Sequence, residues 1–254
     1  MSLDLGPILE GWDENPNSGL AVRMIEGLDG RPKIQLRIEM GLGVMQMELT
    51  GRPDGLRPFG YESLLDYYQA KLEEHRRRYG SDQDFVLDRR DCAALQAESM
   101  QYYYRRLSCL ELGEYVQAIR DADHNLAILD LLKDYAAHRE DWLASEQYRA
   151  FILSHRVKAQ ALACLQQNDV AGALQCIAEG IAAIEEIFEG YGRRDLSEES
   201  VEIAFLKNLR QAIQGHRPPT LRERLEQELQ EAIAAEQFER AAELRDQLRR
   251  LQQN

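Results

Sequence analysis

The sequence predicts a mainly α-helical fold, α+β overall, in which a small sheet precedes a long helical region. Over residues 20–50 apolar side chains alternate with a period of two, as in half-buried strands. Over residues 91–214 they recur at three- and four-residue spacing, as in amphipathic helices. A further helical pattern follows the break at Pro218-Pro219. We therefore expect a small α+β head at 1–85, a helical domain at 90–214, a linker at 215–219 and a helical hairpin at 220–254.

The alternation near the N-terminus predicts a three-stranded antiparallel meander with one buried face. Its first strand is expected in the segment LAVRMIEG, and the turn signals are Asp29-Gly30 and residues 41–43. The positions expected to face the core are Ile34, Leu36, Ile38 and Met40 on the second strand and Met45, Met47 and Leu49 on the third. A helix over residues 61–79 should cover that face, through Leu64, Leu65, Tyr68 and Leu72.

The loop between this sheet and this helix, GRPDGLRPFG at 51–60, is rich in arginine, proline and glycine. Loops held between regular elements often carry functional side chains. If a small anion or an acidic peptide binds here, Arg52 and Arg57 are the candidate residues. A rigid connector without a ligand is the alternative interpretation.

The helical region contains an internal repeat. Residues 112–128 and 167–184 each have a turn, an apolar residue two places later and an alanine three places after that. These positions are Gly113, Tyr115 and Ala118 in the first copy and Asn168, Val170 and Ala173 in the second. The pattern resembles the tetratricopeptide repeat, which would imply stacked helical hairpins that bind peptides or proteins. The copies are 55 residues apart where that family's period is 34, and Arg106 stands where the family has a small residue. A plain helical bundle is the alternative.

Three consecutive tyrosines, Tyr102, Tyr103 and Tyr104, invite comparison with base-stacking platforms. Consecutive residues on a helix point about 100° apart, so the three rings cannot form one platform. We expect them to divide between core and groove positions.

The C-terminal segment 220–254 reads as two short amphipathic helices. Thr220 and Glu223 form a capping-box pattern at the start of the first. Its apolar stripe contains Leu221, Leu225, Leu229, Ala232 and Ile233, and that of the second contains Phe238, Ala241, Leu244, Leu248 and Leu251. Fewer than about 40 residues rarely hold a core unaided, so another surface should cover these stripes.

The run from Leu225 to Leu251, with FERAAELRD at its centre, resembles the UVR motif, the hairpin that ends UvrB and recurs within UvrC. The resemblance implies a protein-docking element, with partner contacts through Leu225, Leu229, Phe238, Ala241, Leu244, Arg245 and Leu248. A homodimer through the hairpin, or a hairpin packed as the last layer of the helical domain, are the alternatives. The chain lacks the G-x-x-x-x-G-K-[ST] loop that the helicase members need, which excludes ATP-driven unwinding.

The charge and composition of the chain limit the classes of partner that it is expected to bind. The 31 Lys and Arg residues against 44 Asp and Glu residues give a net charge of −13, which disfavours direct nucleic-acid binding because phosphates require a basic surface. The N-terminus lacks a basic and an apolar signal region, and no apolar run is long enough for a membrane span. We therefore expect a cytoplasmic protein without membrane contact.

The sequence shows no pattern that predicts chemistry. Its five histidines and four cysteines lack metal-ligand spacing, and it has neither a G-x-S-x-G elbow nor a Gly-rich phosphate loop. We expect no catalytic residues, no cofactor and no metal. The leading interpretation is a non-catalytic adaptor that docks protein partners through the hairpin and through a helical groove. The alternatives are an accessory factor of nucleotide excision repair and an enzyme with its site at loop 51–60.

Overall fold

The computed structural model describes residues 5–13, 15, 19–38 and 43–216. The chain divides into two compact units, Met1–Arg210 and Gln211–Asn254. The predicted hairpin at 220–254 and its partner-binding residues lie outside the described residues, as does Met40. The first unit is mainly helical with a small antiparallel sheet, which confirms the predicted fold class.

The sheet has three strands in the order β1-β2-β3, each antiparallel to its neighbour. They are β1 (Val22–Glu26), β2 (Pro32–Ile38) and β3 (Gly43–Glu48). The register places Ile34 of β2 opposite Met47 of β3, and both side chains are buried as the alternation predicts. Ile38, at the end of β2, departs from the prediction because 41% of it is exposed.

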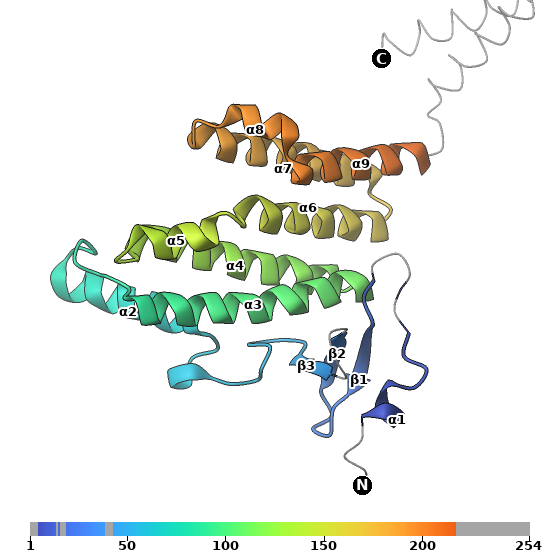
Figure 1. Cartoon of the computed structure of the whole chain (residues 1–254), viewed down its shortest axis with the longest axis horizontal. Coiled ribbons are helices and arrows are strands. Elements are labelled where there is room, and N and C mark those ends of the chain that lie inside the picture. Colours follow the sequence, from blue (N-terminus) through green and yellow to red (C-terminus); the bar gives the residue numbers. More distant parts are fainter. Residues whose placement is uncertain (1–4, 14, 16–18, 39–42, 217–254) are drawn as a thin grey trace, which may run out of the picture. The chain divides into compact units, whose positions relative to one another are not determined.

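The prediction of what covers the sheet was wrong. Its buried face packs against Cys109 and Ala118, which belong to the end of α3 (Arg89–Leu112) and the start of α4 (Tyr115–Tyr135). The helix that follows the sheet, α2 (Leu64–Tyr79), lies against the opposite end of α3 and the last turns of α4 (Figure 1). Loop 51–60 runs along α3 from Arg105, which binds the carbonyl oxygen of Gly51, towards Glu98, which binds the start of α2. The sheet and α2 therefore contribute to two separate clusters.

Helix α2 begins at Leu64, three residues later than predicted, and ends at Tyr79 as predicted. The Ser63 hydroxyl oxygen accepts a hydrogen bond from the backbone N–H of Asp66, and Gly80 ends the helix in the left-handed conformation. Its buried residues Leu65, Tyr68 and Leu72 pack with Leu87, Leu95, Ile128 and Leu132. The helix therefore extends the helical core and does not form a head with the sheet.

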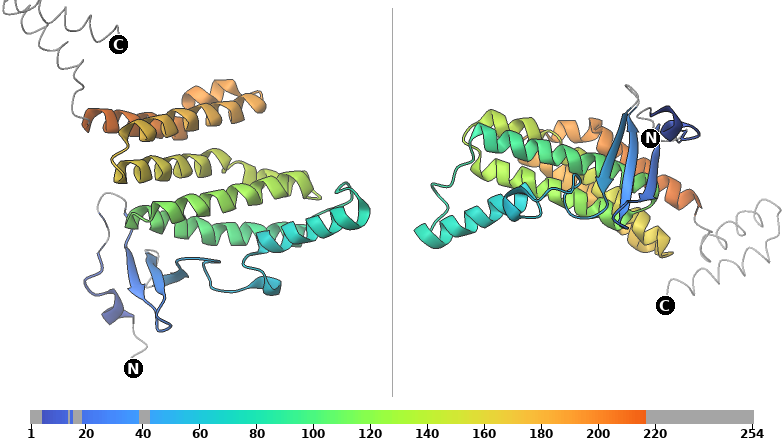
Figure 2. Two further views of the ribbon diagram at one scale, coloured as in Figure 1. Left: turned by 180° about the vertical axis from the view of Figure 1, so that it is seen from behind. Right: turned by 90° about the horizontal axis from the view of Figure 1, so that it is seen from below.

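The helices after α2 stack in chain order, with α5 and α6 following one another in the same layer (Figures 1 and 2). After α3 and α4 come α5 (Arg139–Glu146), α6 (Arg149–Gln166), α7 (Val170–Gly190), α8 (Arg194–Glu199) and α9 (Val201–His216). Helix α4 packs on α3, α5 and α6, and α6 packs on α7. Two short elements, α1 (Gly6–Leu9) and the 3-10 turn η1 (Pro58–Gly60), precede α2.

The internal repeat corresponds to two helical hairpins, α3–α4 and α6–α7. The first turn contains Gly113 with a φ angle of 77°, and the second contains Asn168 with a φ angle of 61°. Both angles are positive. Ala118 and Ala173, which follow five residues after each turn, are fully buried. The small side chain lets the second helix of each hairpin approach the first closely, as the sequence pattern predicts.

Candidate functional site

Two consecutive arginines on α3 occupy the interior of the helical stack. Arg105 is fully engaged: its Nε lies 2.9 Å from Oδ2 of Asp121 on α4, and its Nη2 lies 2.7 Å from Oδ1. Its Nη1 donates to the backbone carbonyl oxygens of Glu48 and Gly51 at 3.0 and 2.7 Å. This one side chain therefore fastens α4, the end of β3 and the start of loop 51–60 to α3.

Arg106 is as deeply buried as Arg105, with 1% of its surface exposed, but it has no such partner. Within the described part of the chain its Nε and Nη1 are buried without an acceptor, and no carboxylate lies within ion-pair distance. The guanidinium carbon lies 5.6 Å from the centroid of the Tyr103 ring. Buried charges in folded proteins are normally paired, because an unpaired one costs several kcal/mol.

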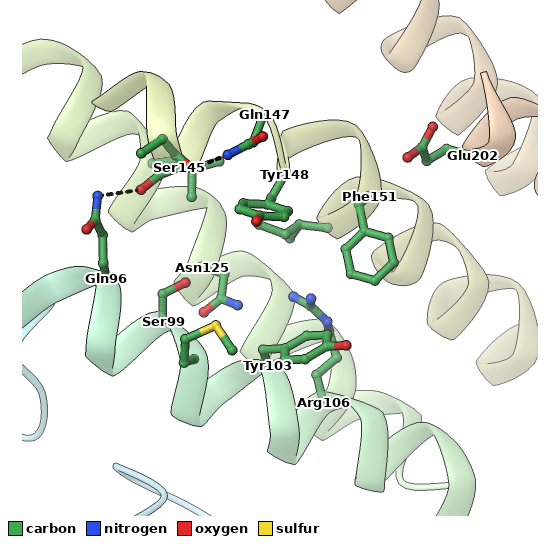
Figure 3. A pocket seen from close by; sticks show the side chains of 14 residues that line it. Gln96, Ser99, Tyr103, Arg106, Asn125, Ser145, Gln147, Tyr148, Phe151 and Glu202 are labelled. Atoms are coloured by element: carbon green, nitrogen blue, oxygen red, sulfur yellow. Dashed lines mark hydrogen bonds between the residues drawn. The ribbon is translucent and has the colours of Figure 1, made fainter. Parts of the chain in front are cut away.

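A cavity of about 650 Å³ lies around this guanidinium, between α3, α4, α5 and α6. Figure 3 shows Tyr103, Arg106 and Asn125 pointing into the same space, with Tyr148 and Phe151 on the other side. The other lining residues are Gln96, Ser99, Met100, Leu129, Ala144, Ser145, Gln147, Ile152 and Glu202. The volume and the mostly apolar lining with a few polar groups are typical of small-ligand pockets.

Hydrogen bonds hold the polar wall of the cavity in place. Gln96 on α3 donates to the hydroxyl of Ser145 at 3.0 Å and to the carbonyl of Asp141 at 2.8 Å, which joins α3 to α5. Arg149 at the start of α6 donates to Glu146 at 2.7 Å, and Tyr191 donates to the same carboxylate at 2.6 Å. These bonds set the position of α5 and of the first turn of α6, on either side of the cavity mouth.

The Arg106 guanidinium is charged at neutral pH. Burial lowers the pKa of Arg106 to about 10, so its guanidinium stays protonated. Burial and the positive charges of Arg106 and Lys158 lower the pKa of the neighbouring His155 to about 3, so that imidazole is neutral. Asp121 acts on Arg106 at longer range but is already bound to Arg105 and Gln117. Among the described residues, the Arg106 guanidinium therefore lacks an ion-pair partner.

The two arginines predicted for an anion site are placed differently. Arg52 is mostly buried and lies within 3.1 Å of a carboxylate oxygen of Asp54 and 3.5 Å of one of Glu98. Arg57 is exposed, with Glu62 3.8 Å away. Anion binding at this loop stays a prediction, but the charge of Arg52 is already balanced by two carboxylates.

Glu98 links that loop to α2 and α4. Its carboxylate accepts hydrogen bonds from the backbone N–H groups of Leu64 and Leu65 at 2.7 and 3.1 Å and lies 3.2 Å from Nε2 of His124. A carboxylate at the first turn of a helix is stabilised by the unpaired N–H groups there. The Glu98 cluster is therefore satisfied within the fold and holds the start of α2 against α3.

The three consecutive tyrosines do not share one environment, as the sequence predicts. Tyr102 is buried and stacks on His124 with ring centroids 3.6 Å apart, whereas Tyr103 lines the cavity. Sequence reasoning identified Arg106 only as a departure from a repeat pattern and did not identify Ser99, Asn125 or Phe151. A charged residue inside an otherwise small or apolar helix stripe was the one available signal.

Over the described ranges, no group of three or more His, Cys, Asp or Glu side chains is placed to hold a metal ion. No helix in that part of the chain is long and apolar enough to cross a membrane. The four cysteines are free: Cys92 and Cys109 are buried, while Cys164 and Cys176 are partly buried and in contact across α6 and α7.

The match to a known family lies in the second unit, Gln211–Asn254. Residues 220–254 match the UvrB/uvrC motif. This UVR motif covers the segment in which the sequence predicts a helical hairpin, and such hairpins often mediate protein interactions. Neither the curated proteins nor the solved structures contain a match to the chain. The comparisons give no support to the tetratricopeptide-repeat resemblance of the middle region.

Proposed function

We propose that the protein is a non-catalytic adaptor that docks a protein partner through its UVR motif. The match of residues 220–254 to that motif is the observation that carries the proposal. The motif falls within a compact unit of its own, Gln211–Asn254, and is preceded by Pro218-Pro219. An amphipathic hairpin whose apolar stripes are not covered by its own chain would offer them to another protein.

The proposed contact residues follow from the sequence pattern. Phe238 and Leu244 are large apolar residues on the stripe expected for the second helix, and aromatic and aliphatic anchors dominate most docking surfaces. Arg245 would add a charged contact at the edge of that stripe. Glu239 and Glu243 are expected on the opposite face and provide matched controls.

The full chain, used as bait, tests this proposal. Partners captured by the unaltered protein are identified, purified and titrated against the full chain and its variants by isothermal calorimetry. Phe238→Asp and Leu244→Asp should each weaken binding at least about tenfold, while Glu239→Ala and Glu243→Ala should change it little. Equal loss in all four variants, or no loss in any, would remove the hairpin from the docking surface.

The description of the matched motif favours one specific variant of this function, an accessory role in nucleotide excision repair. Purified UvrB-type and UvrC-type proteins are the defined partners for testing it. Binding that depends on Phe238 would support this variant, and DNA binding by the chain alone is not expected at a net charge of −13. Light scattering on the full chain distinguishes a homodimer through the same residues.

A further inference from the structure

We propose that the cavity between α3, α4, α5 and α6 binds a small monocarboxylate with an apolar body, and that the carboxylate pairs with Arg106. The proposal does not depend on docking by the UVR motif, since every residue that carries it belongs to the unit Met1–Arg210. It assigns a ligand-binding function to the helical stack.

The side chain of Arg106 is buried at the wall of the cavity. It is 1% exposed, and within the described residues its Nε and Nη1 find no acceptor. Its neighbour Arg105 shows that the same stack can bury an arginine with full compensation, through Asp121 and two carbonyl oxygens. A guanidinium that is left unpaired at the edge of a cavity is arranged for a partner that enters from outside.

The charged residues that line the cavity limit the charge of the ligand. Arg106 supplies one positive charge, and Glu202 stands among the lining residues as the only acidic one. A monoanion can pair with Arg106, whereas a phosphate dianion would bring a second negative charge into an apolar space that already contains a carboxylate. The guanidinium also matches the planar geometry of a carboxylate.

The size and the lining of the cavity limit the size and the polarity of the ligand. A cavity of about 650 Å³ has room for a compact organic acid. Leu129, Phe151 and Ile152 form an apolar wall, while Tyr148, 55% exposed, stands at the mouth. The ligand body should therefore be apolar, with its acid group directed inward.

Asn125 adds a preference within this class. It is 1% exposed, and its Oδ1 has no donor among the described residues. A hydroxyl or N–H group next to the ligand carboxylate would satisfy this acceptor. Acids that carry such a group should bind more tightly than their unsubstituted counterparts.

Ligand binding to the full-length protein is measured by thermal shift and calorimetry. The probes are octanoate, 3-phenylpropanoate and indole-3-acetate, each compared with its neutral amide, together with phenyl phosphate and a short acidic peptide. At least one carboxylate should bind at about 1 mM or below and raise the melting temperature, and its amide should bind at least about tenfold more weakly.

Three variants test whether the ligand binds in this cavity and pairs with Arg106. Arg106→Met removes the charge and keeps an unbranched side chain, so it should abolish the preference for acid over amide. Ser99→Phe fills the cavity and keeps the charge, so it should abolish binding of both. Arg90→Met, a change at an exposed arginine on the same helix, should leave binding unaltered.

Four outcomes would overturn the proposal. They are the absence of binding by every carboxylate, equal binding of acid and amide, unchanged binding in Arg106→Met, and preferential binding of phenyl phosphate. Binding of the acidic peptide alone would contradict the small-molecule assignment. Because Ser99→Phe tests the cavity without altering Arg106, the proposal can still be tested if one variant fails to fold.

Discussion

Arg105 and Arg106 are consecutive residues on α3 and equally buried, yet only Arg105 is paired with a carboxylate in the part of the chain that the structure describes. The difference arises from their direction on the helix, since neighbours point about 100° apart. Arg105 faces Asp121 and the backbone at the end of β3. Arg106 faces the cavity beside Tyr103 and Asn125 (Figure 3). One arginine holds the fold together, and the other offers a free positive charge.

The two arginines should therefore respond oppositely to the same substitution. Arg106→Met removes an unpaired buried charge and should raise the free energy of unfolding by about 1–3 kcal/mol. Arg105→Met leaves Asp121 buried without its counter-ion and should lower it by about 3–5 kcal/mol. Urea unfolding monitored by circular dichroism measures both. A destabilised Arg106→Met would show that the chain itself provides a partner for Arg106.

A second prediction concerns the close approach of α6 and α7. A Cβ added at Gly180 would lie 2.3 Å from Cγ2 of Val157 and 2.7 Å from its Cγ1. Val157 is buried and β-branched, so it cannot rotate away freely. Gly180→Ala should therefore lower the free energy of unfolding by about 1–3 kcal/mol, despite the higher helix propensity of alanine.

Gly190, in the last turn of the same helix, is the matched control. A Cβ there meets no atom within 4 Å. Gly190→Ala should therefore leave the protein unchanged or stabilise it by up to about 1 kcal/mol. Thermal and urea unfolding of the pair compare the two sites directly, and equal effects at both would contradict the contact between Gly180 and Val157.

The third prediction concerns pH. The folded-state pKa of His155 is lowered from 6.5 to about 3, mainly by burial. The unfolded chain therefore binds a proton that the folded one rejects as the pH falls below 6.5, so this group's stabilising contribution is present above that pH and lost below it. The loss should approach about 1.4 kcal/mol per pH unit between pH 6 and about 4.

Paired histidine variants isolate this contribution from that of the carboxylates. His155→Gln should flatten the decline in stability below pH 6.5, whereas His138→Gln, at an exposed position before α5, should follow the unaltered protein. Urea unfolding at a series of pH values gives both profiles. Parallel profiles for all three proteins would mean that His155 is not buried in its neutral form.

A fourth prediction concerns Glu98. Its carboxylate accepts the backbone N–H groups of Leu64 and Leu65 at the start of α2. Glu98→Gln keeps the size but removes the charge, and should lower stability by about 1–2 kcal/mol because charge-assisted bonds to a helix N-terminus are lost. Glu73→Gln, at an exposed position on α2, is the control. Hydrogen exchange should speed up in the first turn of α2 only in the Glu98 variant.

The extent to which the sequence predicted the site can be judged at Arg106. The repeat pattern showed that a charged residue stands where a small one is usual, which pointed to an unusual position but not to a cavity. The cavity is lined by side chains of five helices, α3, α4, α5, α6 and α9, and its polar residues Gln96 and Asn125 have no distinctive spacing. Conversely, Arg52 attracted attention through its loop composition, although its charge is balanced by Asp54 and Glu98.

The sequence by itself determined the local structure: the alternating strands, the Ser63 and Gly80 caps of α2, and the turns at Gly113 and Asn168. These features depend on backbone geometry and on neighbours a few residues away. Only the tertiary structure decided that α3 and α4, and not α2, cover the sheet, and that Asp121 pairs with Arg105 and not with Arg106. Those outcomes depend on the path of the chain through loop 51–60 and on which helix faces meet, and residue spacing alone carries no information about either.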